Sequence, residues 1–190
     1  MSVNQLTGSA LAQNQREIRV AFLGGYAGQF VSGVIWLIAS AVGTFIDPVY
    51  GMLFLFFGCM GIFPLTQLFL RIMGCSAKVD SSNGLWYLGS QLAFTVPINM
   101  VLVWVIIQYN HMLFFPATMI IVGAHYLPFI TLYGMKMFGI LAALLIFGGT
   151  GIIFMGLGSF SLGGWVTGVL LILFAFIGKV IVEREKISHI

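Results

Sequence analysis

Six apolar stretches, each about 18 to 27 residues long and without charge except for Lys179 near the end of the last, constrain this chain more than any other feature of its sequence. An α-helix of that length crosses the hydrocarbon core of a bilayer. Only 7% of the 190 residues are charged, which is too few to cover a water-facing surface. The stretches also lack the alternating polar positions of barrel strands. We therefore expect an all-α polytopic membrane protein, a bundle of about six transmembrane helices.

The expected organisation is one transmembrane domain between two polar tails. The domain covers residues 20–182, and the tails cover residues 1–19 and 183–190. Turn signals such as Asp47-Pro48 separate the spans. The six expected spans are residues 20–46, 50–70, 85–108, 113–133, 137–154 and 162–182.

The positions of the basic residues predict the orientation of the bundle. With these spans, all eight Lys and Arg residues fall on one side of the membrane. Arg16 and Arg19 precede the first span, for example, and Lys186 follows the last. The positive-inside rule assigns that side to the cytoplasm. Both termini are therefore expected to be cytoplasmic.

His125 is the one ionisable residue expected near the bilayer centre. No Asp or Glu lies within a predicted span, so the carboxylate used by most proton- or cation-coupled carriers is missing. A buried histidine needs a hydrogen-bond partner, and it serves either as a ligand-binding or proton-carrying group or as a structural contact across the bundle. The other candidate ligand-binding residues are polar or aromatic side chains of neighbouring spans: Gln29, Thr66, Gln67, Gln91, Thr95, Tyr126 and Tyr133.

Three prolines lie inside predicted spans, at Pro64, Pro97 and Pro128. Each removes a backbone hydrogen bond and tends to kink its helix. The freed carbonyls are then bound by neighbouring side chains, water or a ligand. The prolines therefore indicate either a broken-helix site or kinks that are satisfied internally.

Small residues recur at four-residue spacing in the first and last spans. Gly24, Gly28 and Ser32 form one such face, and Gly164 and Gly168 form another. Small residues let helix backbones approach closely in lipid, where the hydrophobic effect drives little association. These faces predict either packing within the chain or a homo-oligomer.

Several classes of site find no support in the sequence. A metal site needs three or four converging ligands, and one membrane histidine is present. There is no Ser-His-Asp set or glycine-rich phosphate loop, and the basic residues form no nucleic-acid patch. We expect no metal, cofactor or nucleic-acid partner, and an enzyme is not favoured because one acid–base candidate is visible.

Three segments carry a resemblance to a known family. Residues 122–135 read VGAHYLPFITLYGM, residues 62–66 read IFPLT, and residues 93–97 read AFTVP. Together they resemble an uncharacterised family of small bacterial multi-pass membrane proteins, a domain of unknown function with a GAHYLPF…LYGM signature. The resemblance implies a bacterial inner-membrane location and no particular activity. It places His125, Pro128 and Tyr133 inside the signature.

Two functional hypotheses follow. The first is a protein that binds or transports a small neutral or lipophilic molecule in a pocket near His125. The alternative is a structural or accessory membrane protein that acts through helix–helix assembly with a partner or with itself. The substrate, the energy source and the oligomeric state do not follow from the residues.

Overall fold

The computed structural model describes residues 3–75 and 78–187, and every regular element in those ranges is a helix. Six helical segments are long and apolar enough to cross a membrane. The expected all-α bundle of six spanning helices is thereby confirmed. The six segments are Leu23–Phe45, Pro48–Ile72, Gly84–Ile107, His111–Tyr133, Met137–Met155 and Leu162–Glu185.

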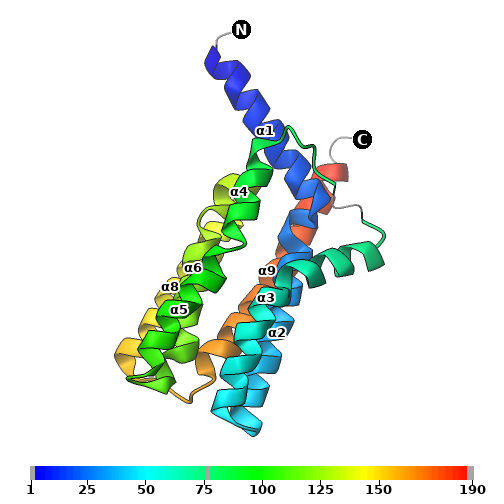
Figure 1. Cartoon of the computed structure of the whole chain (residues 1–190). Helices are drawn as coiled ribbons and strands as arrows, with labels where there is room; N and C mark the ends of the chain where they lie inside the picture. The colour runs from blue at the N-terminus through cyan, green and yellow to red at the C-terminus, as the bar shows by residue number, and fades with distance from the viewer. Residues whose placement is uncertain (1–2, 76–77, 188–190) are drawn as a thin grey trace.

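Two of the spans are each divided into two helices by a break (Figure 1). Helices α4 and α5 form the third span, and α6 and α7 belong to the fourth. The α-helices are α1 (Val3–Ala21), α2 (Tyr26–Phe45), α3 (Pro48–Ile72), α4 (Gly84–Leu92), α5 (Thr95–Ile107), α6 (Phe114–Tyr126), α7 (Phe129–Tyr133), α8 (Met137–Met155) and α9 (Leu162–Ile187). Two short 3-10 helices are η1 (Leu23–Gly25) and η2 (His111–Leu113).

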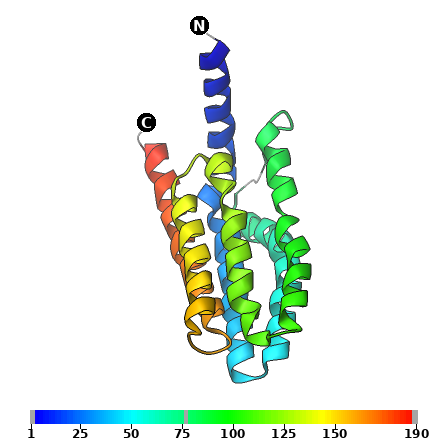
Figure 2. The same ribbon diagram turned by 90° about the vertical axis from the view of Figure 1, so that its left-hand side faces the viewer.

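The spanning helices form two groups. In the first, which we call the α2 group, α2 packs along both α3 and α9. In the second, the α6 group, α6 packs along α8 and α5. Contacts within each group are much more extensive than contacts between them, and Figure 1 shows the groups as separate sets of helices. In Figure 2, turned by 90°, the α6 group lies in front of the α2 group. We call the boundary between the two groups the seam.

Glycines bring the helices close together within each group. A Cβ added at Gly33 of α2 would lie 3.0 Å from the Gly168 carbonyl oxygen of α9. In the α6 group, a Cβ at Gly123 would lie 3.0 Å from the Ala142 carbonyl oxygen of α8. Such backbone approach is the usual basis of helix packing in lipid.

The small-residue faces predicted from the sequence contact other helices of the same chain. A Cβ at Gly24 would meet α9, and one at Gly28 would lie near α3. At Gly164 it would collide with side chains of α2 and α6, and at Gly168 with α2. Ser32 is buried as well. These residues therefore pack the bundle itself, and the oligomer predicted from them stays a prediction.

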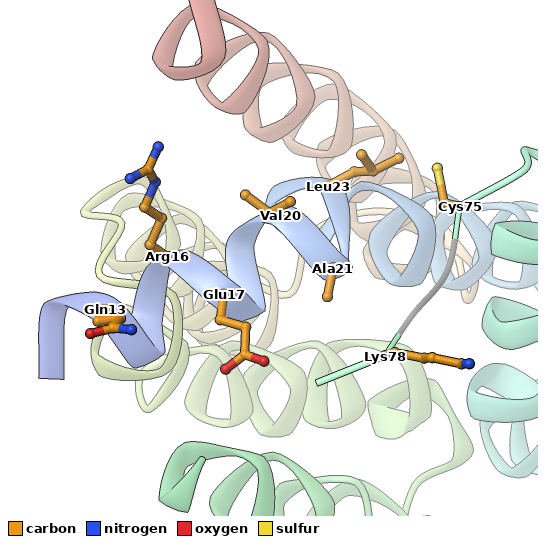
Figure 3. A pocket seen from close by; sticks show the side chains of 8 residues that line it. All are labelled: Gln13, Arg16, Glu17, Val20, Ala21, Leu23, Cys75 and Lys78. Carbon is orange, nitrogen blue, oxygen red and sulfur yellow. The ribbon is translucent and has the colours of Figure 1, made fainter. Parts of the chain in front are cut away.

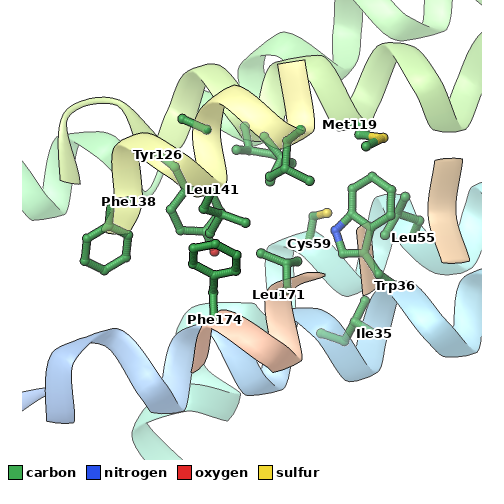
Figure 4. Packing of buried hydrophobic residues seen from close by; sticks show 14 of the residues in the cluster. Ile35, Trp36, Leu55, Cys59, Met119, Tyr126, Phe138, Leu141, Leu171 and Phe174 are labelled. Atoms are coloured by element: carbon green, nitrogen blue, oxygen red, sulfur yellow. The ribbon is translucent and has the colours of Figure 1, made fainter. Parts of the chain in front are cut away.

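Large side chains fill the middle of the seam. Trp36 of α2 and Phe174 of α9 extend from one group, and Tyr126 and Phe138 extend from the other (Figure 4). The rings of Trp36 and Phe115 lie 6.1 Å apart across this boundary. The hydrophobic core of the protein is thus located where the two groups meet.

Helix α2 is separated from α1 by residues in left-handed conformation. Leu23 has φ 51°, Gly24 has φ 67° and Gly25 has φ 85°. Positive φ is unfavourable for leucine and readily adopted by glycine. The chain therefore turns at this point, and the N-terminal segment expected as a polar tail is helical from Val3 and extends beyond the bundle (Figure 1).

All the basic residues in the described ranges lie at or beyond one end of the spans, which we call the basic end. Both ends of the chain lie there too (Figure 1). The opposite end, where α2 meets α3 and α5 meets η2, carries no Lys or Arg in those ranges, and we call it the neutral end. The cytoplasmic location of the basic end stays a prediction.

Candidate functional site

His125 forms a hydrogen bond with Thr95 between two neighbouring spans. The Nδ1 atom of His125, on α6, lies 2.8 Å from Oγ1 of Thr95, on α5. His125 is eight residues before the end of its span at Tyr133, a rise of roughly 12 Å. The pair is therefore placed inside the membrane, nearer to the basic end.

Both residues lie beside helix breaks that prolines explain. Proline lacks an N–H, and its ring clashes with the carbonyl four residues earlier. Pro97 accordingly follows the break between α4 and α5, and Pro128 lies in the break between α6 and α7. Pro64 lies within α3, which stays helical through it and bends sharply partway along its length (Figure 1). The helix breaks at Pro97 and Pro128 thus lie next to each other in neighbouring spans, on either side of the Thr95–His125 pair.

The hydroxyl of Thr95 determines which nitrogen of His125 carries a proton. Its oxygen lies 2.8 Å from the carbonyl oxygen of Leu92, which accepts only. The single hydroxyl proton is used in that bond, so Thr95 accepts from Nδ1–H of His125. In the neutral imidazole, the lone pair is then on Nε2. No partner for Nε2 occurs among the residues that the structure describes.

Aromatic rings surround one side of His125. Its ring centroid lies 4.9 Å from that of Phe129 and 5.6 Å from that of Tyr126. Tyr126 stacks on Phe138 at 6.0 Å, and Phe138 lies 5.0 Å from Tyr133. We call Tyr126, Phe129, Tyr133 and Phe138 the aromatic cluster. This environment is apolar and suits the carbon skeleton of a lipophilic molecule.

The other predicted site residues are spread over several environments. Thr66 is buried and donates to the Ile62 carbonyl oxygen at 2.7 Å. Gln67 is half-buried and Gln91 is exposed. Gln29 is buried at the seam. The structure thus brings Thr95, Tyr126 and His125 together, whereas none of the hydrogen bonds within the described ranges joins these glutamines or Thr66 to His125.

Sequence reasoning missed the role of α1, which contacts the end of the fourth span. Gln15 Nε2 donates to the Thr131 carbonyl oxygen at 2.6 Å, and Arg19 donates to the Tyr133 carbonyl oxygen at 2.6 Å. Arg19 also forms an ion pair of 3.2 Å with Glu185 of α9. Gln15 and Arg19 are four residues apart on one helix face. That spacing was the available signal.

Glu17, on the same helix, binds the loop between α3 and α4. It accepts hydrogen bonds from the Asp80 backbone N–H at 2.6 Å and from Asn83 Nδ2 at 2.7 Å. The Asp80 carboxylate accepts from the backbone N–H and the hydroxyl of Ser82, and these bonds lower its pKa. Residues 80–83 of the loop are therefore held against α1.

A cavity of about 580 Å³ lies beside α1 (Figure 3). Its basic side chains, Arg16 and Lys78, point away from one another in Figure 3. Its one acidic side chain, Glu17, binds the loop already described. The lining does not converge on a ligand and includes no predicted site residue. The lining residues are Gln13, Arg16, Glu17, Val20, Ala21, Leu23, Cys75 and Lys78.

No group of three or more His, Cys, Asp or Glu side chains that would suit a metal ion occurs within residues 3–75 and 78–187.

The fold and these contacts define an α-helical multi-pass membrane protein in which Thr95 and His125 form a hydrogen bond beside two helix breaks. The chain belongs to a family of unknown function, DUF7010, whose model matches residues 11–180. No curated protein and no solved structure matches it. The predicted membership of an uncharacterised family is confirmed, while the signature motif and the bacterial origin stay predictions.

Proposed function

We propose that this protein binds a small neutral or lipophilic molecule within the membrane, at the Nε2 atom of His125. The observation that carries the proposal is the hydrogen bonding of Thr95, whose single proton is given to Leu92. The Nδ1–H of His125 is then directed to Thr95, and the Nε2 lone pair has no partner among the described residues. An unpaired acceptor at this depth is unfavourable unless a donor reaches it.

The surroundings of His125 indicate the chemistry of the ligand. Nε2 accepts a hydrogen bond, so the ligand carries a donor such as a hydroxyl or an amide N–H. The rings of Tyr126 and Phe129 adjoin His125 and favour an apolar body. A charged ligand is disfavoured because no acidic or basic side chain lies within a described span near the pair to offset its desolvation.

We place this activity in a bacterial inner membrane, with both termini in the cytoplasm. The support is the collection of basic residues at one end of the bundle, which the positive-inside rule assigns to the cytoplasm. Binding at this site either retains the molecule or is a step in its transport.

Assembly through the small-residue faces is the less favoured function. Gly24, Gly164 and Gly168 already approach other helices of the chain so closely that an added Cβ would come within 3.0 Å of them. A partner helix at these faces would have to displace α9 or α2. The faces therefore support packing of the bundle better than docking of a second copy.

Native mass spectrometry of protein released from mild detergent tests the proposal. Asn places a polar atom near the position of Nδ1 and has none at the position of Nε2, so His125→Asn keeps a partner for Thr95 and removes the ligand contact. The exposed His111 provides the matched control, His111→Asn. We expect a bound small molecule on the parent and on His111→Asn, and its loss from His125→Asn. Equal occupancy of all three proteins, or an empty parent, would contradict the proposal.

A further inference from the structure

Gln29 of α2 has no hydrogen-bond partner for either amide atom. Its side chain is 2% exposed, and both Nε2 and Oε1 are enclosed without a donor or an acceptor in the described part of the chain. Trp36, seven residues later, is fully buried with its Nε1–H unpaired. Buried polar groups are almost always paired. Two unpaired side chains two helical turns apart therefore indicate partners that the closed packing does not supply.

Both side chains lie on the face of α2 that borders the seam. Gly25 is one turn before Gln29, and a Cβ added there would lie 3.0 Å from the Phe138 ring of α8 and 3.8 Å from Gln29 Oε1. Trp36 lies against Phe115 of α6. Helical spacing puts Gln29 between these two contacts. The unpaired amide is thus directed towards the α6 group and next to the aromatic cluster.

The two groups are joined closely at the neutral end. Gly163 and Gly164, at the start of α9, approach the start of α6, and an added Cβ at Gly163 would lie 3.1 Å from the Pro116 nitrogen. At Gly164 it would lie 2.5 Å from the Phe115 ring. Backbone contact of this kind is difficult to separate, because packed glycines leave no flexible side chain to adjust.

At the basic end the groups touch through side chains, since a Cβ added at Gly178 of α9 would lie 2.8 Å from the Met137 side chain of α8. They are also joined there through α1. The short helix α7 lies between two breaks, at Pro128 before it and at Gly134 after it, and Gly134 has φ 65°. Gln15 and Arg19 bind the carbonyls of α7, and Arg19, whose side chain is 15% exposed, also binds Glu185 of α9. We call Gln15 and Arg19 the latch. The latch connects α7, beside the α6 group, with the end of the α2 group.

We propose that the seam opens at the basic end when the latch releases α7, and that Gln29 then lines a polar path for the ligand. The close contacts at Gly163 and Gly164 hold the neutral end together during this movement. The amide of Gln29 offers one donor and one acceptor, so it selects a neutral molecule that carries both, such as an amide or an alcohol. The identity of that molecule rests on the proposed function, whereas the opening does not.

Cysteine labelling in membranes tests the opening without any ligand. In a background with Cys59→Ala and Cys75→Ser, Gln29→Cys is treated with a water-soluble methanethiosulfonate reagent. Ala39→Cys is the matched control because Ala39 is fully buried on the same helix where α3 packs. We expect Gln29→Cys to react faster than the control. Adding Arg19→Ala removes a hydrogen bond from a charged group and should raise the rate about tenfold or more.

Equal and slow labelling at both positions, unchanged by Arg19→Ala, would overturn the proposal, provided that both thiols react after denaturation. If Gln29→Cys does not fold, Ser32→Cys is the second labelling position, since Ser32 is buried one turn further along and cysteine is nearly isosteric with serine. His125→Asn should leave the labelling rate unchanged. Failure of the ligand site and failure of the opening are thereby distinguished.

Discussion

Replacing Gln29 by methionine should stabilise the closed protein. Methionine is unbranched and of similar length, so it fills the same space without a polar atom. The substitution removes two buried atoms that have no partner among the described residues. Leaving such groups unpaired costs about 1–3 kcal/mol, so we expect the free energy of unfolding to rise by about that amount. For a chain of this size the melting temperature should then rise by about 2–10 °C.

Thermal unfolding in a mild detergent measures this change. Thr118→Val is the control, because Thr118 is fully buried but its hydroxyl donates to the Phe114 carbonyl oxygen at 2.7 Å. Its removal should change the melting temperature little. An unchanged or lower melting temperature for Gln29→Met would refute the reasoning, since it would show that Gln29 has a partner in the closed state.

Two further pairs of substitutions test the packing and the site. Gly178→Ala places a Cβ 2.6 Å from the Gly24 carbonyl oxygen and should destabilise the protein by about 1–3 kcal/mol. Gly151→Ala is its control, because the space around Gly151 is open, and it should be neutral or stabilising by up to about 1 kcal/mol. Equal melting temperatures of these two variants would contradict the packing at Gly178. Thr95→Val removes the hydroxyl that bonds His125 and should lower the free energy of unfolding by about 1–3 kcal/mol. Thr95→Ser keeps a hydroxyl and should retain most of that stability. A Thr95→Val protein as stable as the parent would exclude this bond from the folded state.

The spans were predictable because the bilayer imposes length and polarity on each of them. The stretch from Pro48 to Ile72, for example, is recognisable because Asp47 precedes it and its first charged residue is Arg71, next to its end. Depth was also informative, since it placed His125 and Thr95 at similar heights in neighbouring spans. Their direct contact also depends on which faces of the two helices pack together. In lipid both the buried and the exposed faces of a helix are apolar, so the sequence does not show which face is buried.

The features missed by the sequence analysis depend on tertiary contacts. Polar residues such as Gln15 and Glu17 are typical of a solvated tail, and their bonds to distant carbonyls and loop groups depend on the position of α1 at the basic end of the bundle. The depth of Gln29 along its span predicts a pocket shared with His125, and that stays a prediction. In the structure it faces the seam, beside the aromatic cluster.

The hydrogen-bonding state of the His125 ring tests the central claim most directly. In a variant with His111→Gln and His189→Gln, His125 is the one histidine left in the sequence. Nitrogen-15 NMR of ring-labelled histidine in lipid bilayers then reports which nitrogen is protonated. The account predicts a proton on Nδ1 and a lone pair on Nε2 whose resonance shifts when a hydrogen-bond donor binds. A proton on Nε2 with none on Nδ1 would show that Thr95 is not the acceptor and would contradict the proposed site.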